Sequence, residues 1–130
     1  YYDIEIFSWA KVPAAISRSV QHYVVICDEA HAMQSMDSAR TKDTLSLVLA
    51  DRCKGVLLLT GTPMKNGRPS NLFPLLKAVR HPFGDKQRLY EAFFCNGQQK
   101  QYGGRYVWDN SGRSNLGLLK GHITSHVFHK

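Results

Sequence analysis

The sequence predicts an α/β fold in which a parallel sheet is flanked by helices. Two short apolar segments, 23–27 and 56–60, have the composition of strands that are buried on both faces. Segments with helical periodicity lie between and after them, and this alternation is typical of parallel sheets covered by helices. Polar residues follow each apolar segment, at the edge where open α/β sheets bind their ligands.

The composition restricts the class of protein. The chain has 130 residues, of which 43% are hydrophobic, as expected for a globular domain or part of one. Its apolar runs are shorter than the roughly 18 residues of a membrane-spanning helix, so no contact with a membrane is expected. The odd number of cysteines, Cys27, Cys53 and Cys95, is typical of a reducing compartment. The net charge of +7 is compatible with a polyanionic partner.

The N-terminal part of the chain is expected to hold a strand, a short helix and the first buried strand. The segment 2–9 is rich in Ile and Phe and predicts a strand. Pro13 suits the first turn of a helix over 14–20. The apolar segment 23–27 then leads directly into Asp28.

A helix is expected between the two buried strands. Asp37 or Ser38 can cap its start, and it extends over about 39–51. Positions i, i+3, i+4 and i+7 on its inner face are Leu45, Val48, Leu49 and Arg52. Gly55 then precedes the second buried strand, 56–60.

Three further helices and an irregular insertion are expected after the second strand. Ser70 can cap the first helix, and the His-Pro-Phe-Gly turn 81–84 ends it. Asp85 can cap the next helix. Residues 96–113 are rich in glycine and aromatic residues and predict an irregular insertion. The apolar faces of the three helices are Leu72, Leu75, Leu76 and Val79; Leu89, Phe93 and Phe94; and Leu116, Leu119, Ile123 and Val127.

Two adjacent carboxylates follow the first buried strand, in the sequence Asp-Glu-Ala-His. In a nucleotide hydrolase, an Asp at a strand end holds Mg²⁺ beside the phosphates, and a neighbouring Glu orients the attacking water. Asp28 and Glu29 suit these two roles, and His31 can sense the γ-phosphate. Alternatively, the two carboxylates cap the start of a helix.

The sequence Thr-Gly-Thr-Pro follows the second buried strand. Thr60 and Thr62 can hydrogen-bond the acidic cluster of the adjacent strand. Gly61 permits a tight turn, and Pro63 restricts the backbone where the chain leaves that turn. An ordinary strand-to-helix turn with Thr as a cap is the alternative. Two such segments, each after its own buried strand, favour a nucleotide site.

The chain resembles the first motor lobe of SNF2-type, superfamily 2 helicase-related ATPases. The segment 24–31, VVICDEAH, resembles motif II, and 57–66, LLLTGTPMKN, resembles motif III. The following NLFPLLKAVRHPFG, 71–84, agrees with the family. The segment 6–13, IFSWAKVP, is similar to the motif Ib region, with Trp in place of the usual Tyr. The stretch 108–120, WDNSGRSNLGLLK, resembles the annealing-helicase, HARP-like branch.

The resemblance implies a partial RecA-like (P-loop NTPase) lobe. Residues 1–84 would be the C-terminal half of the lobe, and 85–130 a helical insertion. It further implies ATP and Mg²⁺ as cofactors, duplex or forked DNA as partner, and ATP-driven translocation or remodelling. Asp28 would bind Mg²⁺, and Glu29 would be the catalytic base. The implied nucleotide-binding and coupling residues are Asp28, His31, Thr60, Gly61 and Thr62, and those near the DNA backbone are Ser8, Trp9, Lys65 and Asn66.

The sequence departs from the family at the phosphate-binding loop. It contains no GxxxxGK[ST] segment and no second lobe with arginine fingers. We therefore expect these 130 residues alone neither to bind ATP tightly nor to hydrolyse it.

Two alternatives to a motor stay open. A non-catalytic nucleic-acid or protein-binding module could retain the motor fold, although such a module would not need both Asp28 and Glu29. A metal-dependent nuclease would need further carboxylates near Asp28, and the predicted helix carries Asp37 and Asp43 away. The expected location is intracellular: cytoplasm or nucleoid in a bacterium or virus, nucleus in a eukaryote.

Three histidines on the last helix suggest a second kind of site. His122, His126 and His129 would form one stripe, and Cys95 could complete a zinc site with them. We favour a partly solvated helix flank, because the cysteines do not pair.

The insertion mixes aromatic and basic side chains. These are Lys100, Tyr102, Arg105, Tyr106, Trp108 and Arg113. They could line or stack on DNA, but packing of the aromatic rings in a small satellite core is the favoured interpretation.

Overall fold

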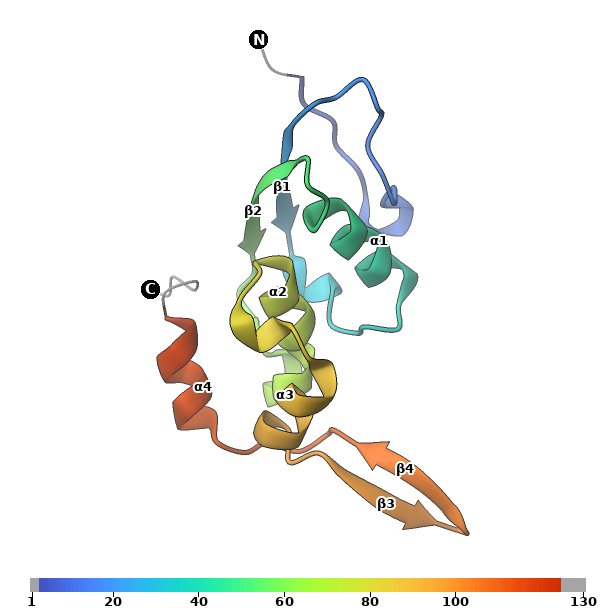
Figure 1. Ribbon diagram of the computed structural model, residues 1–130, viewed down its shortest axis with the longest axis vertical. Coiled ribbons are helices and arrows are strands. Elements are labelled where there is room, and N and C mark those ends of the chain that lie inside the picture. The colour runs from blue at the N-terminus through green and yellow to red at the C-terminus, as the bar shows by residue number, and fades with distance from the viewer. Residues whose placement is uncertain (1–2, 125–130) are drawn as a thin grey trace.

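The computed structural model describes residues 3–124 and shows an α/β architecture (Figure 1). In this range β1 (Tyr23–Asp28) and β2 (Cys53–Leu59) form a parallel pair, and β3 (Gln98–Tyr102) and β4 (Arg105–Asp109) form a separate antiparallel hairpin. The helices are α1 (Ala39–Val48), α2 (Phe73–Ala78), α3 (Gln87–Phe94) and α4 (Leu116–Ile123). The predicted parallel sheet with flanking helices is confirmed. Among the described residues, no helix is both long and apolar enough to cross a membrane.

The register of the parallel pair places the two polar segments side by side. Asp28, the last residue of β1, pairs with Leu59, the last residue of β2. Because the strands are parallel, their carboxyl ends meet at one edge of the sheet. Thr60 therefore lies next to the residues that follow Asp28.

The hydrophobic core lies between the sheet and helices α1 and α2, and continues to α3 and α4. Its largest fully buried side chains include Phe73, Met33, Leu76 and Leu119. The rings of Phe73 and Tyr90 lie 5.2 Å apart, and the Tyr90 hydroxyl donates to the carbonyl of Pro69 over 2.6 Å. These contacts connect α3 to α2 and to the 3₁₀ helix Pro69–Asn71.

One face of the parallel pair is open to solvent. Val24, Ile26, Leu57 and Leu59 are between 44% and 67% exposed. Their neighbours along the strands, such as Cys27 and Leu58, point the other way and contact the core. The expectation that both strands are buried on both faces is thus wrong for these residues. We define this set of four exposed residues as the open sheet face.

The N-terminal strand predicted for 2–9 is not formed. Residues 3–8 have no regular secondary structure, and Ile4 and Ile6 are almost fully exposed. A 3₁₀ helix, Trp9–Lys11, follows. The residue types of this segment favour a strand, but a strand forms only when it can pair with another strand. Residues 3–8 have no partner strand within the described part of the chain.

The helix predicted for 14–20 is also wrong. The guanidinium group of Arg52 donates to three carbonyl oxygens of this segment, at 2.7–2.9 Å, and its carbon lies 5.7 Å from the ring centre of Tyr23. The acceptors are the carbonyls of Ile16, Ser17 and Val20. Of these three carbonyls, that of Ser17 also accepts from the amide of Val20 in a single turn, which does not continue as a helix. Since α1 ends at Val48, Arg52 lies outside the helix in which it was predicted.

The helix starts differ from the predicted ones in two of three cases. Ser38 caps α1 as expected, because its hydroxyl accepts from the backbone N–H of Thr41. Ser70 instead lies in a 3₁₀ helix, Pro69–Asn71, and α2 begins without a side-chain cap. The cap position of α3 is Lys86 rather than Asp85.

The inner face of α3 is also different from the prediction. Leu89 and Phe93 are exposed, whereas Tyr90, Glu91 and Phe94 are buried. The buried set includes a carboxylate, which apolar periodicity cannot identify.

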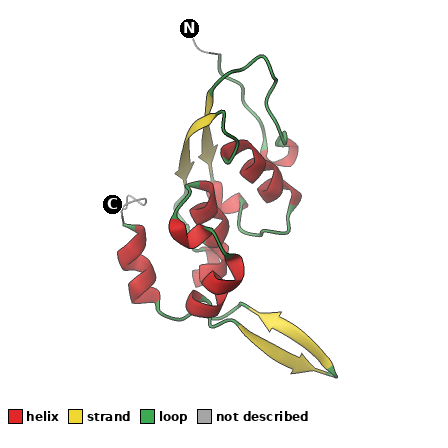
Figure 2. Cartoon of the chain, viewed as in Figure 1, coloured by secondary structure: helices red, strands yellow, loops and turns green. Residues whose placement is uncertain are grey.

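The insertion is more regular than predicted. Residues 98–109 form the β3–β4 hairpin, shown in yellow at the lower right of Figure 2. Gly103 and Gly104 connect the strands with φ of 53° and 83°. Positive φ at both central residues is the geometry of the tightest hairpin turns, and a Gly-Gly pair favours it. This dipeptide is the signal that could have predicted the hairpin.

Candidate functional site

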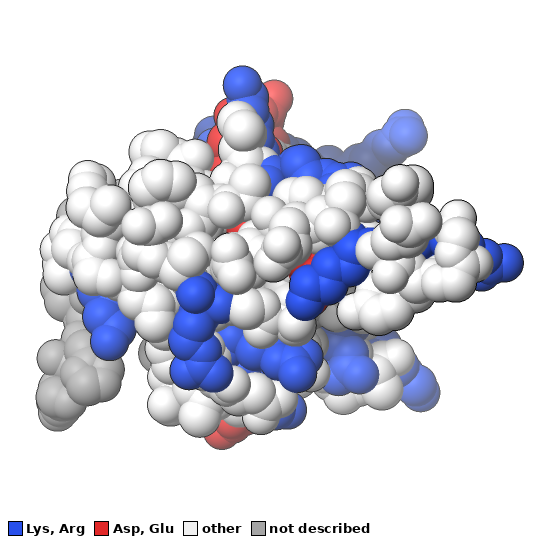
Figure 3. All heavy atoms as spheres, turned by 90° about the horizontal axis from the view of Figure 1, so that it is seen from below, with Lys and Arg blue, Asp and Glu red and all other residues white. Residues whose placement is uncertain are grey.

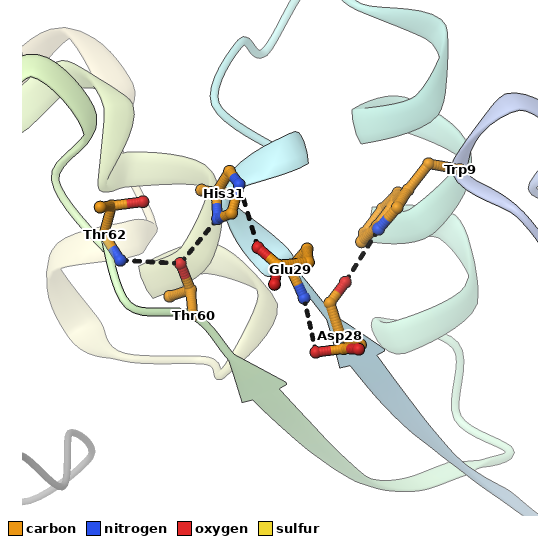
Figure 4. Close-up of polar contacts among 6 residues, drawn as sticks. All are labelled: Trp9, Asp28, Glu29, His31, Thr60 and Thr62. Atoms are coloured by element: carbon orange, nitrogen blue, oxygen red, sulfur yellow. Dashed lines mark hydrogen bonds and ion pairs between the residues drawn. The ribbon is translucent and has the colours of Figure 1, made fainter.

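Both polar segments lie together at the carboxyl edge of the β1–β2 sheet (Figure 4). Figure 4 shows Asp28 and Glu29 at the end of β1 and Thr60 and Thr62 beyond the end of β2, with His31 between the two groups. The sequence prediction that these residues form one cluster is therefore consistent with the geometry.

Asp28 is fixed from two sides. Its backbone carbonyl accepts from the indole N–H of Trp9 over 2.9 Å. Its carboxylate oxygen Oδ1 accepts from the backbone N–H of Glu29 over 3.0 Å. The side chain of Asp28 is exposed, so its carboxylate is oriented by the backbone and still accessible from solvent.

Glu29 has an unusual backbone conformation. Its φ of 53° and ψ of 48° lie in the left-handed region, which costs a residue with a Cβ atom roughly 1–2 kcal/mol. Strained residues of this kind cluster at functional sites. The conformation turns the chain sharply between β1 and the 3₁₀ helix Ala30–Ala32, and leaves the Glu29 side chain 70% exposed.

His31 connects the two segments. Its Nε2 lies 3.3 Å from Oε2 of Glu29, and its Nδ1 lies 2.9 Å from Oγ1 of Thr60. The backbone N–H of Thr62 donates to the same Thr60 oxygen over 3.1 Å. The contact with Glu29 is a close approach of an imidazole nitrogen to a carboxylate oxygen, whereas the contact with Thr60 is a hydrogen bond. The residues form a continuous series of polar contacts from Glu29 to Thr62.

A polar hollow of about 370 Å³ lies beside His31. Its lining includes the cations Arg40 and Lys65, with Gln34, Ser35 and Ser38. Arg40 and Gln34 were not singled out from the sequence. They become neighbours of Lys65 only through folding, so no local pattern could have identified them.

The four residues expected near DNA have different surroundings. Ser8, Lys65 and Asn66 are exposed. Trp9 is partly buried against the core, and its N–H is bonded to Asp28. The tryptophan therefore holds the end of β1 in place. Its predicted role, and those of the other three, stay predictions.

The carboxylate of Asp28 fits one way of binding Mg²⁺. Mg²⁺ in phosphate-transfer sites is held by one or two carboxylates together with substrate phosphates and water. Within residues 3–124, no group of three or more His, Cys, Asp or Glu side chains could enclose a metal ion. The exposed carboxylate at the strand end thus suits an ion that arrives with a nucleotide.

Two of the four residues suggested as zinc ligands, Cys95 and His122, are described, and each has other contacts. Cys95 is fully buried, and burial raises the pKa of its thiol to about 12. Nδ1 of His122 donates a hydrogen bond to the carbonyl of Leu118, and the His122 ring lies 5.4 Å from that of Phe83. His126 and His129 lie outside the described residues.

Gly61 is not required by the turn that it occupies. Its φ is outside the left-handed region, and a Cβ atom added there meets nothing within 4 Å. We expect Gly61→Ala to change the free energy of unfolding by no more than about 0.5 kcal/mol. Thermal unfolding measures this, and a fall in Tm of several degrees would contradict it.

Comparisons with known proteins identify one family and several relatives to which the chain is similar. A family model described as the SNF2-related domain matches residues 2–108. The DNA annealing helicase and endonuclease ZRANB3 of Mus musculus is 40% identical over 96 residues, which are 74% of this chain and 9% of that protein. The SWI/SNF-related matrix-associated actin-dependent regulator of chromatin subfamily A-like protein 1 of Bos taurus is 36% identical over 97 residues, 75% of this chain and 10% of that protein.

A more distant relative is the chromatin-remodeling ATPase INO80 of Cryptococcus neoformans, which is 36% identical over 80 residues. These residues are 62% of this chain and 4% of that protein. The chain thus spans 9–10% of the length of the first two relatives. No solved structure matches the chain.

Proposed function

The chain belongs to the SNF2-related domain family, and on this premise we propose that it is part of a motor that couples ATP hydrolysis to movement on, or remodelling of, duplex DNA. The observation that carries the proposal is the His31 bridge between the two strand ends. A group that contacts both the acidic segment and the threonine segment is what a nucleotide-sensing site needs.

We assign the site residues to roles in phosphoryl transfer. Asp28 would hold Mg²⁺, which supplies positive charge to the phosphate oxygens. Glu29 would orient the attacking water and accept its proton. The Glu29–His31–Thr60 contacts would transmit a change at the γ-phosphate to β2 and the segment after it. Thr62 and Gly61 would line the nucleotide side of the same edge.

We further propose that Ser8, Trp9, Lys65 and Asn66 lie on the DNA side of the lobe. Lys65 is the strongest of the four on physical grounds, because it is an exposed cation on the hollow beside His31. A backbone phosphate bound there would be close to the residue that contacts Glu29. The relatives named as a DNA annealing helicase and a chromatin-remodeling ATPase favour DNA as the partner and an intracellular setting.

We propose that residues 1–84 belong to a partial RecA-like lobe and residues 85–130 to an insertion in it. The open sheet face supports this division. A parallel sheet normally has both faces covered, so a further segment of a longer protein would cover Val24, Ile26, Leu57 and Leu59.

The test is ATP hydrolysis by the full-length protein, with and without duplex and forked DNA. Turnover that DNA stimulates supports the motor. Absence of ATP turnover, with DNA binding retained, would contradict the motor and favour a non-catalytic nucleic-acid-binding module.

The 130 residues alone are expected to show no ATP turnover above background, with or without DNA. The described site offers carboxylates and hydroxyl groups but not the Gly-rich loop that cradles phosphates. The measurement is phosphate release by this piece at high protein concentration. Turnover that DNA stimulates in the isolated piece would contradict the expectation.

A further inference from the structure

The β3–β4 hairpin projects from the helical part of the molecule (Figure 1). Its strands pair with each other over residues 98–109, and a Cβ atom added at Gly103 or Gly104 would meet nothing within 4 Å. The tip is therefore surrounded by solvent. A two-stranded ribbon in water is only marginally stable, so its base must be held by the rest of the fold.

Glu91 on α3 holds that base. This carboxylate is only 4% exposed, and its Oε1 accepts from the indole N–H of Trp108 over 2.9 Å. Its Oε2 accepts from the amide of Asn110 over 2.6 Å. The guanidinium of Arg88 stacks on the Trp108 ring at 4.0 Å from its centre. These contacts explain Trp108 as the residue that anchors the hairpin to α3.

The two tyrosines near the tip have the opposite environment. Tyr102 is 60% exposed and Tyr106 is 71% exposed. The register pairs Tyr106 with Gln101 and Tyr102 with Arg105, so the two rings lie on opposite faces of the ribbon. Packing in a core does not explain two exposed rings on opposite faces, and the favoured sequence interpretation is wrong for them.

The charge of this end of the molecule favours an anionic partner. Figure 3, viewed from below in the orientation of Figure 1, shows Lys and Arg side chains spread over the surface with few carboxylates. The basic residues of 86–120 are Lys86, Arg88, Lys100, Arg105, Arg113 and Lys120. The acidic residues of this range are both engaged, because Glu91 is buried in the contacts above and Asp109 pairs with Lys100.

Asp109 forms an ion pair with Lys100. The hydrogen bonds from Lys100 and Ser111 hold the pKa of the Asp109 carboxyl well below its usual range. Arg105, beside the turn, pairs with Tyr102 across the hairpin and directly precedes Tyr106 in the sequence.

We propose that the hairpin tip binds unpaired nucleotides of a nucleic acid, with Tyr102 and Tyr106 stacking on bases and Arg105 contacting a phosphate. An aromatic ring stacks on a base only where a base face is open, as at a fork, a gap or a strand end. Inside a duplex both faces of each base are covered. This inference rests on the proposed DNA partner but not on ATP hydrolysis.

The test compares Tyr102→Ala/Tyr106→Ala with Tyr102→Phe/Tyr106→Phe in the full-length protein. Binding is measured by fluorescence anisotropy, without ATP, to a forked probe with single-stranded arms and to a blunt duplex of the same length. We expect the alanine pair to bind the forked probe about tenfold more weakly. The loss on the blunt duplex should be much smaller, and the phenylalanine pair should resemble the wild type.

Three results would overturn the proposal. They are an unchanged affinity of the alanine pair for the fork, an equal loss on both probes, and a phenylalanine pair as weak as the alanine pair. ATP turnover of the wild type is measured on the same preparation. If the proposed motor function is wrong, DNA will not stimulate this ATP turnover. If only the hairpin proposal is wrong, the binding comparison alone will show it.

Discussion

Glu29→Gln is expected to lower the rate of ATP hydrolysis by the full-length protein by about 100-fold or more, while ATP binding is retained. A positioned general base contributes roughly 10²–10⁴ to a rate, and an amide cannot accept the proton of the attacking water. The substitution changes little else. Glutamine has nearly the same shape, so its side-chain oxygen can keep the contact with Nε2 of His31. The measurements are steady-state phosphate release and nucleotide binding on the same preparation.

Asp37→Asn is the matched control. This substitution also removes one exposed carboxylate. Asp37 lies in the loop between His31 and α1, away from the contacts that link Glu29 to Thr62. Its turnover should equal that of the wild type. Equal turnover in Glu29→Gln and Asp37→Asn would show that Glu29 has no role in the hydrolysis step. A loss of ATP binding in Glu29→Gln would show that the residue contributes to ATP affinity rather than to the chemical step.

Phe73→Ala is expected to destabilise the fold by about 3–5 kcal/mol, the usual cost of truncating a buried aromatic side chain. Phe73 is 1% exposed, and its ring lies 5.2 Å from that of Tyr90. Its removal leaves a cavity at the point where α2 meets α3. Amide hydrogen exchange of α2 and α3 in the full-length protein measures the free energy of opening locally, even if other domains unfold separately.

The same substitution at Phe93 is the comparison. Phe93 is 48% exposed on α3, and its backbone carbonyl keeps its bonds from Ser114 and Asn115 in the variant. We expect a cost of about 1 kcal/mol or less. Similar protection losses in the two variants would mean that Phe93 is buried in the full-length protein and that the inner face of α3 is the one predicted from the sequence.

The parts of the site that follow directly from the sequence are local ones. Asp28 and Thr60 could be placed because each follows an apolar segment, and parallel strands put their carboxyl ends at one edge. The contact between His31 and Thr60 follows from that placement. Ser38 at the start of α1 is similarly local, because a hydroxyl cap acts within one helical turn.

The parts that could not be predicted depend on residues distant in sequence. Arg52 replaces a predicted helix with a loop by binding carbonyls about 32–36 positions away. Glu91 is buried because Trp108 and Asn110 satisfy its oxygens. A carboxylate has no apolar signature, so periodicity alone assigns it to the surface. The left-handed conformation of Glu29 is equally invisible in the sequence, because glutamate has no preference for it.

The open sheet face has a consequence for how these residues tolerate mutation. Judged by their exposure, Val24, Ile26, Leu57 and Leu59 resemble ordinary surface positions, where most substitutions are neutral. If a neighbouring segment covers them, the same positions are core positions, and a polar replacement would weaken the docking of that segment and shift the strand end that carries Asp28. Variant interpretation based on exposure in these 130 residues would then classify damaging alleles at the four positions as harmless.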